Sequence, residues 1–264
     1  MQKYLELLLT GFKRSLMFKF ELIVTIITPF IFMFVYFSVW SSIYNYNNLA
    51  EVGGLTLLQM IAYMSISMSI SFAIISGTDG YLSYEIREGK FSSTMAKPMG
   101  IQRYIFFRDS GEILFRLLSV SLPAIAGAFL IFHVPIPETD IFLLFLVSIM
   151  FSYILSFSIA FIVGLFAFHT EFSRGIIRFK EILVVFFSGM FLPLYLFPEP
   201  LKSIAFILPF QAIINTPISI FIGKISGAEA LFSIIEQIIW IIVLVVVGKI
   251  FLNYSLKKYN AQGG

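Results

Sequence analysis

The chain has 264 residues, of which 59 % are hydrophobic and only 12 % are charged, and its mean hydropathy is +0.94. Soluble domains carry about 25 % charged residues, so this composition excludes an ordinary soluble domain and favours a chain whose solvent is lipid. The absence of cysteine excludes disulfides and thiol catalysis, and the small net charge of +3 gives no sign of a nucleic-acid-binding face.

The N-terminal stretch, residues 1–19, has apolar side chains at helical spacing on one face and basic or polar side chains on the other. Such an amphipathic helix is suited to lie in the membrane interface. We therefore interpret residues 1–19 as an interfacial helix. The alternative is a frayed terminus that touches lipid.

Six long apolar segments follow, and most reach the length of about 20 residues that a helix needs to cross a bilayer. Pro29 lies within the first, where it can kink the helix. The fourth is over-long, which suggests a tilt, and the fifth is short and runs into irregular sequence. The sequence predicts an all-α polytopic membrane protein with a single transmembrane domain over residues 1–264. Its six spans are expected at residues 20–40, 54–75, 113–132, 141–168, 182–197 and 230–252.

The basic residues are distributed unevenly between these segments. If the N-terminus is cytoplasmic, all of the 18 Lys and Arg residues except Lys202 and Lys224 fall on the cytoplasmic side. An excess of Lys and Arg in cytoplasmic loops is a strong signal of orientation. We therefore expect a multi-pass protein of the cell membrane whose N- and C-termini are both cytoplasmic.

Residues 193–224, between the fifth and sixth spans, hold half of the ten prolines in the chain. The segment is too apolar for a solvated loop and too broken for one span, so we predict re-entrant helices that enter the outer leaflet and turn back. The alternative is a seventh, kinked span at residues 204–222. That span would place the C-terminus outside and violate the charge asymmetry.

The polar stretch at residues 78–111 separates the second span from the third and predicts two short helices. Thr78 or Asp79 can cap the first helix, and Gly89 can supply the left-handed residue that ends it. The second helix should stop at Lys97, because the residue before a proline is disfavoured in a helix. The pair would present an apolar face with a charged rim: Ile86, Phe91 and Met95, surrounded by Glu85, Arg87, Glu88, Lys90 and Lys97.

Such a surface suits a helix-in-groove contact with a soluble partner, although a basic loop lying on anionic lipid would have a similar composition. The stretch EIREGKFSSTMAKPMGIQRYIFFRD, residues 85–109, resembles the first cytoplasmic loop of the permeases of type-2 ABC exporters. In these permeases the third span is preceded by an acidic residue, a glycine, a hydrophobic residue, and a basic residue followed by proline. The resemblance extends to the overall plan of an interfacial helix, six spans and broken outer helices.

The resemblance implies that this loop is the coupling helix that sits on an ABC ATP-binding subunit. It assigns that role to Glu85, Arg87, Gly89, Phe91, Met95, Lys97 and Pro98. It also implies that ATP and Mg²⁺ bind to the partner ATPase, with no cofactor on this chain. Six spans are half of the usual dozen, so a second permease subunit, identical or related, should complete the transporter.

The chain contains no G-x-x-x-x-G-K-[ST] motif, so we expect it to be a non-catalytic subunit. His133 and His169 fall on opposite sides of the membrane in this topology and cannot share a metal. The function we predict is that of the membrane-spanning permease of an ATP-driven exporter. The alternatives are an ion-coupled secondary transporter, which would show internal repeats and a charged site near the midplane, and a membrane scaffold subunit.

One acidic residue, Glu236, lies inside the sixth span, about 10 Å from its start at a rise of about 1.5 Å per residue. A carboxylate at such a depth is costly and normally faces protein or water. Gln237 is its neighbour, and Gln211 lies in the broken segment nearby. We regard Glu236, Gln237 and Gln211 as candidates for the transport pathway. The alternative for Glu236 is an acid solvated by the outer vestibule.

Overall fold

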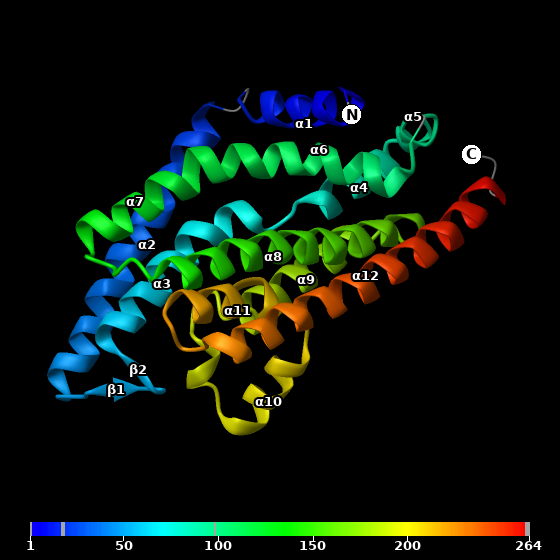
Figure 1. The fold of residues 1–264 in the computed structure, drawn as a ribbon. Coiled ribbons are helices and arrows are strands. Elements are labelled where there is room, and N and C mark those ends of the chain that lie inside the picture. Colours follow the sequence, from blue (N-terminus) through cyan, green and yellow to red (C-terminus); the bar gives the residue numbers. More distant parts are fainter. Residues whose placement is uncertain (1, 17–18, 98, 262–264) are drawn as a thin grey trace.

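The structure, a computed structural model, describes residues 2–16, 19–97 and 99–261. Apart from one two-stranded hairpin, its regular elements are helices, and they form an elongated bundle (Figure 1). The elements in chain order are α1 (Gln2–Ser15), α2 (Lys19–Tyr46), β1 (Glu51–Val52), β2 (Leu55–Thr56), α3 (Leu57–Ile74), α4 (Thr78–Arg87), α5 (Phe91–Met95), α6 (Ile101–Arg116), α7 (Leu122–Ile131), α8 (Thr139–Leu165), α9 (Ser173–Phe187), α10 (Glu199–Ile207), α11 (Gln211–Phe221) and α12 (Gly227–Ala261).

Five helical stretches within the described part of the chain are long and apolar enough to cross a membrane. They match the first, second, third, fourth and sixth predicted spans, so the prediction of an all-α polytopic membrane protein is confirmed. The stretches are Leu22–Tyr46, Leu57–Arg87, Ile101–Ile131, Thr139–Phe168 and Gly227–Lys257. Pro29 lies inside α2, as expected.

The third span is longer than the sequence predicted. The helix begins at Ile101 instead of residue 113, and protein covers part of its polar stretch; Asp109, for example, is buried. A π-helical turn, Leu117–Ser121, joins α6 to α7. Pro123 is the second residue after this turn and has no N–H to donate, which the wider turn accommodates.

The predicted boundaries of the fifth span are wrong. The helix in this region, α9, begins at Ser173 and ends at Phe187, and irregular backbone follows it to Pro193. Gly189 has a φ of +80°, which a residue with a side chain rarely adopts, and it turns the chain away from the helix. The apolar run in the sequence continues past this turn, and so it indicated a helix where the backbone is irregular.

Side chains of α3 and a backbone N–H of α11 satisfy this irregular backbone. The hydroxyl of Tyr63 donates to the carbonyl of Gly189 at 2.9 Å, and the hydroxyl of Ser67 donates to the carbonyl of Met190 at 2.9 Å. The backbone N–H of Asn215 donates to the carbonyl of Ser188, also at 2.9 Å. Non-helical backbone surrounded by apolar groups is tolerated when protein supplies its hydrogen bonds.

The segment before the last span is broken into two short helices, as predicted. Helices α10 and α11 meet at an angle of 102°, so they do not form one gently kinked span. Helix α11 is buried along its whole length between α8 and α12, whereas α10 lies at the end of the bundle near β1 and β2 (Figure 1). That residues 193–224 enter the outer leaflet and turn back stays a prediction.

The N-terminal helix α1 packs alongside α6 (Figure 1). The two backbones meet at a pair of glycines: a Cβ at Gly111 would meet the carbonyl oxygen of Leu8, and a Cβ at Gly11 would meet that of Arg108. Aromatic pairs flank this contact, such as Phe12 on Phe115 with ring centroids 5.2 Å apart. Helix α1 is therefore a docked part of the fold.

Candidate functional site

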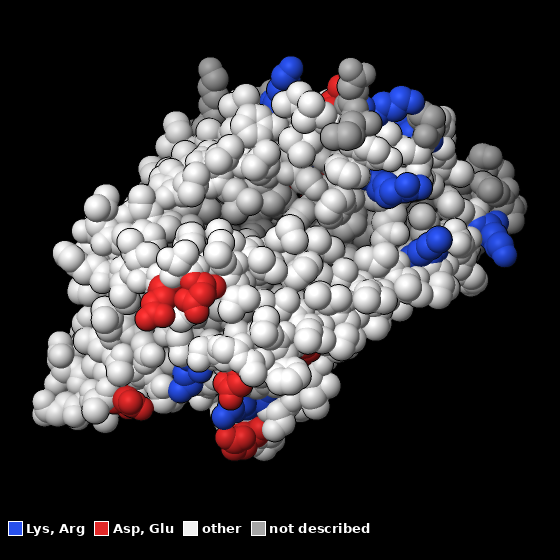
Figure 2. Space-filling model, viewed as in Figure 1, with Lys and Arg blue, Asp and Glu red and all other residues white. Residues whose placement is uncertain are grey.

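The loop between the second and third spans forms a compact projection at one end of the molecule. We call residues 78–97, which comprise α4, the turn after it and α5, the knuckle. Figure 1 shows it at the same end as both chain termini, opposite β1, β2 and α10. On the face drawn in Figure 2, most Lys and Arg gather at the knuckle end, while acidic and basic side chains mix at the opposite end.

The local structure of the knuckle follows the prediction except at its start. Gly89, with a φ of +66°, ends the first helix as expected, and α5 covers Phe91–Met95. The prediction that Thr78 or Asp79 caps α4 is wrong, because the capping position is Gly77 and no side chain bonds there. Ser76 and the partners of Asp79 described below hold this end of the helix instead. The predicted site residue Pro98 lies outside the described residues.

The apolar face of the knuckle is turned into the protein. Phe91 is fully buried and packs edge-on against Phe168, with ring centroids 5.1 Å apart. Ile86 and Met95 are partly buried against the same cluster, which also contains Leu82, Ile105, Phe157, Phe161, Leu165 and Leu252. The expectation that Phe91 is exposed on this face is therefore wrong. The apolar residues are anchored on α6, α8 and α12, because these helices leave a hydrophobic surface that they can cover.

The outer surface of the knuckle is polar and charged. Arg87, Glu88, Lys90 and Lys97 are exposed, and Glu85 is partly exposed. The Nζ of Lys90 donates to the hydroxyl of Tyr84 at 2.7 Å, and this bond raises the pKa of Lys90. The structure therefore brings the predicted charged residues together on a surface that a partner can reach, supported from below by Phe91 and Met95.

Two buried polar contacts tie the knuckle to α9. The Nζ of Lys180 lies 2.8 Å from Oδ2 of Asp79, in an ion pair whose side chains are only 9 % and 4 % exposed. The hydroxyls of Ser83 and Ser173 are hydrogen-bonded at 2.7 Å. The sequence analysis considered Asp79 only as a helix cap and missed both pairings, since no local pattern pairs a residue of α4 with one of α9.

A second buried network holds the elbow between α3 and α4. The hydroxyl of Ser76 donates to Oδ2 of Asp109 at 2.9 Å, and the hydroxyl of Tyr153 donates to the same oxygen at 3.1 Å. The backbone N–H of Ser76 in turn donates to the hydroxyl of Ser156 at 2.9 Å. The elbow is thereby joined to α6 and α8. The sequence analysis missed this network. The feature that could have revealed it is Asp109, an acidic residue close to a long apolar run.

The candidate pathway residues form a second polar site, between α8, α11 and α12. Nε2 of Gln211 donates to Oε1 of Glu236 at 3.1 Å, and the hydroxyl of Thr216 donates to Oε1 of Gln211 at 2.9 Å. The predicted proximity of Gln211 to Glu236 is confirmed. Glu236 is partly exposed, whereas Gln211 is buried.

Gln237 has a different environment. It is fully buried; its Oε1 accepts from the hydroxyl of Ser148 at 3.0 Å, and its Nε2 donates to the carbonyl of Ala212 at 2.8 Å. These bonds join α12 to α8 and α11, so Gln237 has the surroundings of a packing residue. Glu236 is the member of the predicted set that reaches the surface.

The fold and the two sites define a class: a polytopic helical membrane protein with a docked amphipathic helix and a charged knuckle at one end of the bundle. Among the described residues, no group of three or more metal-ligating side chains could hold a metal ion. Residues 22–263 match the family model described as ABC-2 family transporter protein. The chain belongs to this family of membrane transport permeases, and membership implies an ATP-binding partner subunit. A comparison with curated proteins gave no match.

Proposed function

We propose that this chain is the membrane-spanning permease of an ATP-driven exporter of the cell membrane. A separate ABC subunit would bind ATP and Mg²⁺ and hydrolyse the nucleotide, and this chain would have no catalytic role. A second permease, identical or related, would complete the pathway. The N- and C-termini and the knuckle would face the cytoplasm, where the ATPase is.

The observation that carries this proposal is the construction of the knuckle. Its charged outer surface is exposed, while its apolar side and the Asp79–Lys180 ion pair fix it rigidly to α6, α8, α9 and α12. If a bound ATPase displaced the knuckle, the packed contacts would transmit the displacement to the transmembrane helices, whereas a flexible loop would not transmit it. A loop that only lies on lipid has no need of a buried ion pair.

Charge reversal on the knuckle tests the coupling. The double variant Arg87→Glu with Lys97→Glu should reduce several-fold the amount of ATPase that co-purifies with the tagged chain from its own cells. Charge reversal turns attraction across an interface into like-charge repulsion, which slows association and weakens binding. The ATPase is recognised by its G-x-x-x-x-G-K-[ST] motif in mass spectrometry and by ATP hydrolysis in the eluate.

The matched control reverses two exposed basic residues outside the knuckle, Lys13 on α1 and Lys257 on α12. This control should keep the ATPase. Wild-type recovery of the ATPase by the Arg87/Lys97 variant, or a wild-type chain that brings down no P-loop ATPase, would contradict the proposal. Truncation of Phe91 is a poor test, because its loss would open a cavity in the core and destabilise the fold.

We also propose that Glu236 faces a water-filled part of the transport pathway. Its carboxylate is partly exposed beside Gln211, on a long helix that is largely apolar. A carboxylate in contact with lipid would cost several kcal/mol, roughly 2.5–3.5 kcal/mol on insertion scales. A surface that stays wet avoids this cost and would offer a polar contact to a passing substrate.

Thiol labelling tests the exposure of this position to water without knowledge of the substrate, since the chain has no cysteine. In membranes, Glu236→Cys should react with a hydrophilic methanethiosulfonate reagent, whereas Ile239→Cys, one turn along the same helix, should not. Ile239 is an exposed apolar residue of α12 and reports on the lipid-facing surface. Equal labelling of both positions, or labelling of neither, would remove Glu236 from the pathway.

A further inference from the structure

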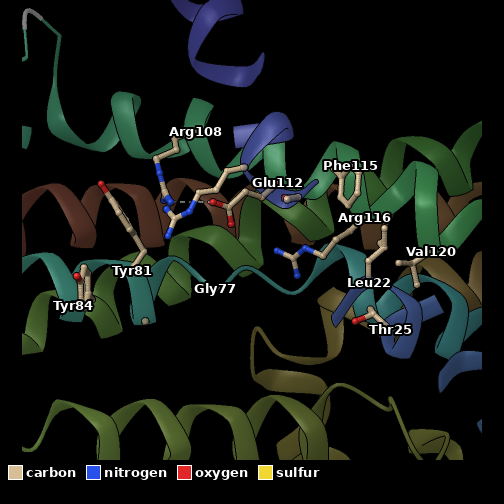
Figure 3. A pocket seen from close by; sticks show the side chains of 13 residues that line it. Leu22, Thr25, Gly77, Tyr81, Tyr84, Arg108, Glu112, Phe115, Arg116 and Val120 are labelled. Atoms are coloured by element: carbon tan, nitrogen blue, oxygen red, sulfur yellow. Dashed lines mark hydrogen bonds and ion pairs between the residues drawn. The ribbon is translucent and has the colours of Figure 1, made fainter. Parts of the chain in front are cut away.

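A cavity of about 520 Å³ lies where α1 and α2 meet α4 and α6. It is within the range of roughly 300–1,000 Å³ that is usual for ligand sites. Figure 3 shows it from close by: Tyr81, Tyr84, Arg108 and Glu112 lie towards one end, and Leu22 and Val120 lie at the other. Its lining includes Tyr84, which also accepts a hydrogen bond from Lys90 on the outer surface of the knuckle, but it shares no residue with the Glu236 site.

The charged end of the cavity carries a net positive charge. Four charged side chains line it, namely Arg14, Arg108, Arg116 and Glu112. Arg108 and Glu112 form an ion pair at 2.9 Å, which leaves Arg14 and Arg116 with no carboxylate at ion-pair distance among the described residues. Asp109 does not line the cavity, although its charge interacts with that of Arg116 from within the protein. The site is therefore electrostatically prepared for an anion.

Two of the three arginines, Arg108 and Arg116, are held in place by the fold. The Nη1 of Arg116 donates to the carbonyls of Phe72 and Ile75, at 3.3 and 3.2 Å, at the C-terminal end of α3. The guanidinium of Arg108 lies over the ring of Tyr81, 3.5 Å from its centroid. Pre-ordered guanidinium groups lose little entropy on binding and can pair with phosphate oxygens through two parallel bonds.

The other end of the cavity is mostly apolar, and Thr25 is the polar residue that Figure 3 labels there. Leu22, Phe115 and Val120 line it, and Ile23 and Ile27, next to Leu22 on α2, are exposed. A basic end joined to an apolar exit matches a molecule that has a phosphate at one end and hydrocarbon at the other. Basic pockets between membrane helices are known to bind the headgroups of anionic lipids.

We propose that this cavity binds the phosphate headgroup of an anionic glycerophospholipid, with the acyl chains leaving between α2 and α6. The chemistry that recognises it is shared with free phosphate, but the apolar exit favours the lipid. A bound lipid would join α1 to α2, α4 and α6, since Arg14 and Ser15 belong to the α1 wall of the cavity. The site goes beyond the proposed function and does not depend on an ATPase.

Native mass spectrometry of the purified chain tests this proposal, with phosphatidylglycerol, phosphatidylcholine and inorganic phosphate added in separate arms. The wild type should retain phosphatidylglycerol in preference to phosphatidylcholine, and inorganic phosphate should not displace it. Loss of one arginine that contacts the headgroup should reduce retention about fivefold, the factor expected for one basic residue near an anionic lipid.

Arg14→Gln is the primary variant. Among the described residues, Arg14 forms no ion pair that holds the helices together, so its replacement should leave the fold intact. Arg116→Gln is the second, and Arg103→Gln is the matched control: Arg103 is on α6, is exposed and does not line the cavity. The proposal is overturned if Arg14→Gln and Arg116→Gln retain as much lipid as Arg103→Gln, or if phosphatidylcholine is retained equally. Displacement by inorganic phosphate would assign the site to a soluble anion and also overturn it.

Discussion

Replacing Lys180 by Met is expected to lower the free energy of unfolding by about 3–5 kcal/mol, because Asp79 becomes a buried carboxylate without its counter-charge. The carboxylate oxygen that faces Lys180 has no aligned hydrogen-bond donor among the described residues. The ion pair at 2.8 Å is therefore its main compensation. The effect is measured as a fall in the thermal and denaturant midpoints of the purified protein in a fixed detergent.

The same helix supplies a matched control. Arg178 forms an ion pair with Glu181 at 2.7 Å, but the two side chains are 81 % and 41 % exposed. Arg178→Met should therefore change stability by no more than about 1 kcal/mol. The double variant Asp79→Asn with Lys180→Met should recover part of the loss, since it removes the unpaired charge. The buried ion pair has no special role if Lys180→Met and Arg178→Met lose similar amounts of stability. The same conclusion follows if the double variant recovers none of the stability that Lys180→Met loses.

Adding a methyl group at Gly111 is expected to displace α1 from the bundle. In Gly111→Ala the new Cβ would overlap the carbonyl oxygen of Leu8, and backbone cannot move aside as a flexible side chain can. Overpacking of this kind costs about 1–3 kcal/mol. Because the strain is confined to the α1–α6 contact, the expected readout is faster amide hydrogen exchange in residues 2–15.

Gly80→Ala provides the comparison. Gly80 also lies within a helix, but a Cβ there would have no heavy atom within 4 Å. Alanine is favoured over glycine in helices by roughly 0.5–1 kcal/mol, so this change should leave α1 docked and stability unchanged or slightly higher. Unchanged exchange in residues 2–15 of Gly111→Ala would mean that α1 is not held by its contact with α6.

The local elements of the knuckle were predictable because their causes are local. Gly89 ends α4 since only glycine adopts a positive φ without cost, and this holds whatever surrounds it. The orientation of Phe91 was not predictable in the same way. An aromatic residue on an amphipathic helix can face a partner or its own protein, and the buried cluster on α8 and α12 decides which.

The fifth span shows the same limit of prediction from the sequence. The apolar run at residues 182–197 indicated a helix, but hydrophobicity reports burial and does not distinguish a helix from irregular backbone. The backbone after Phe187 leaves the helix because Tyr63, Ser67 and Asn215 supply the hydrogen bonds that it then needs. These donors come from α3 and α11, far away in the sequence.

The sequence by itself determined the membrane class, five of the spans and the position of the knuckle, because each depends on the length of an apolar run or on a single turn residue. It also singled out Glu236 and Gln211 as neighbours, through the rarity of polar groups in apolar helices. Only the tertiary structure decided the Asp79–Lys180 ion pair, the burial of Phe91 and the cavity that is lined by three arginines. These features join helices that are distant in the chain, and the contacts that create them exist only once the helices have packed.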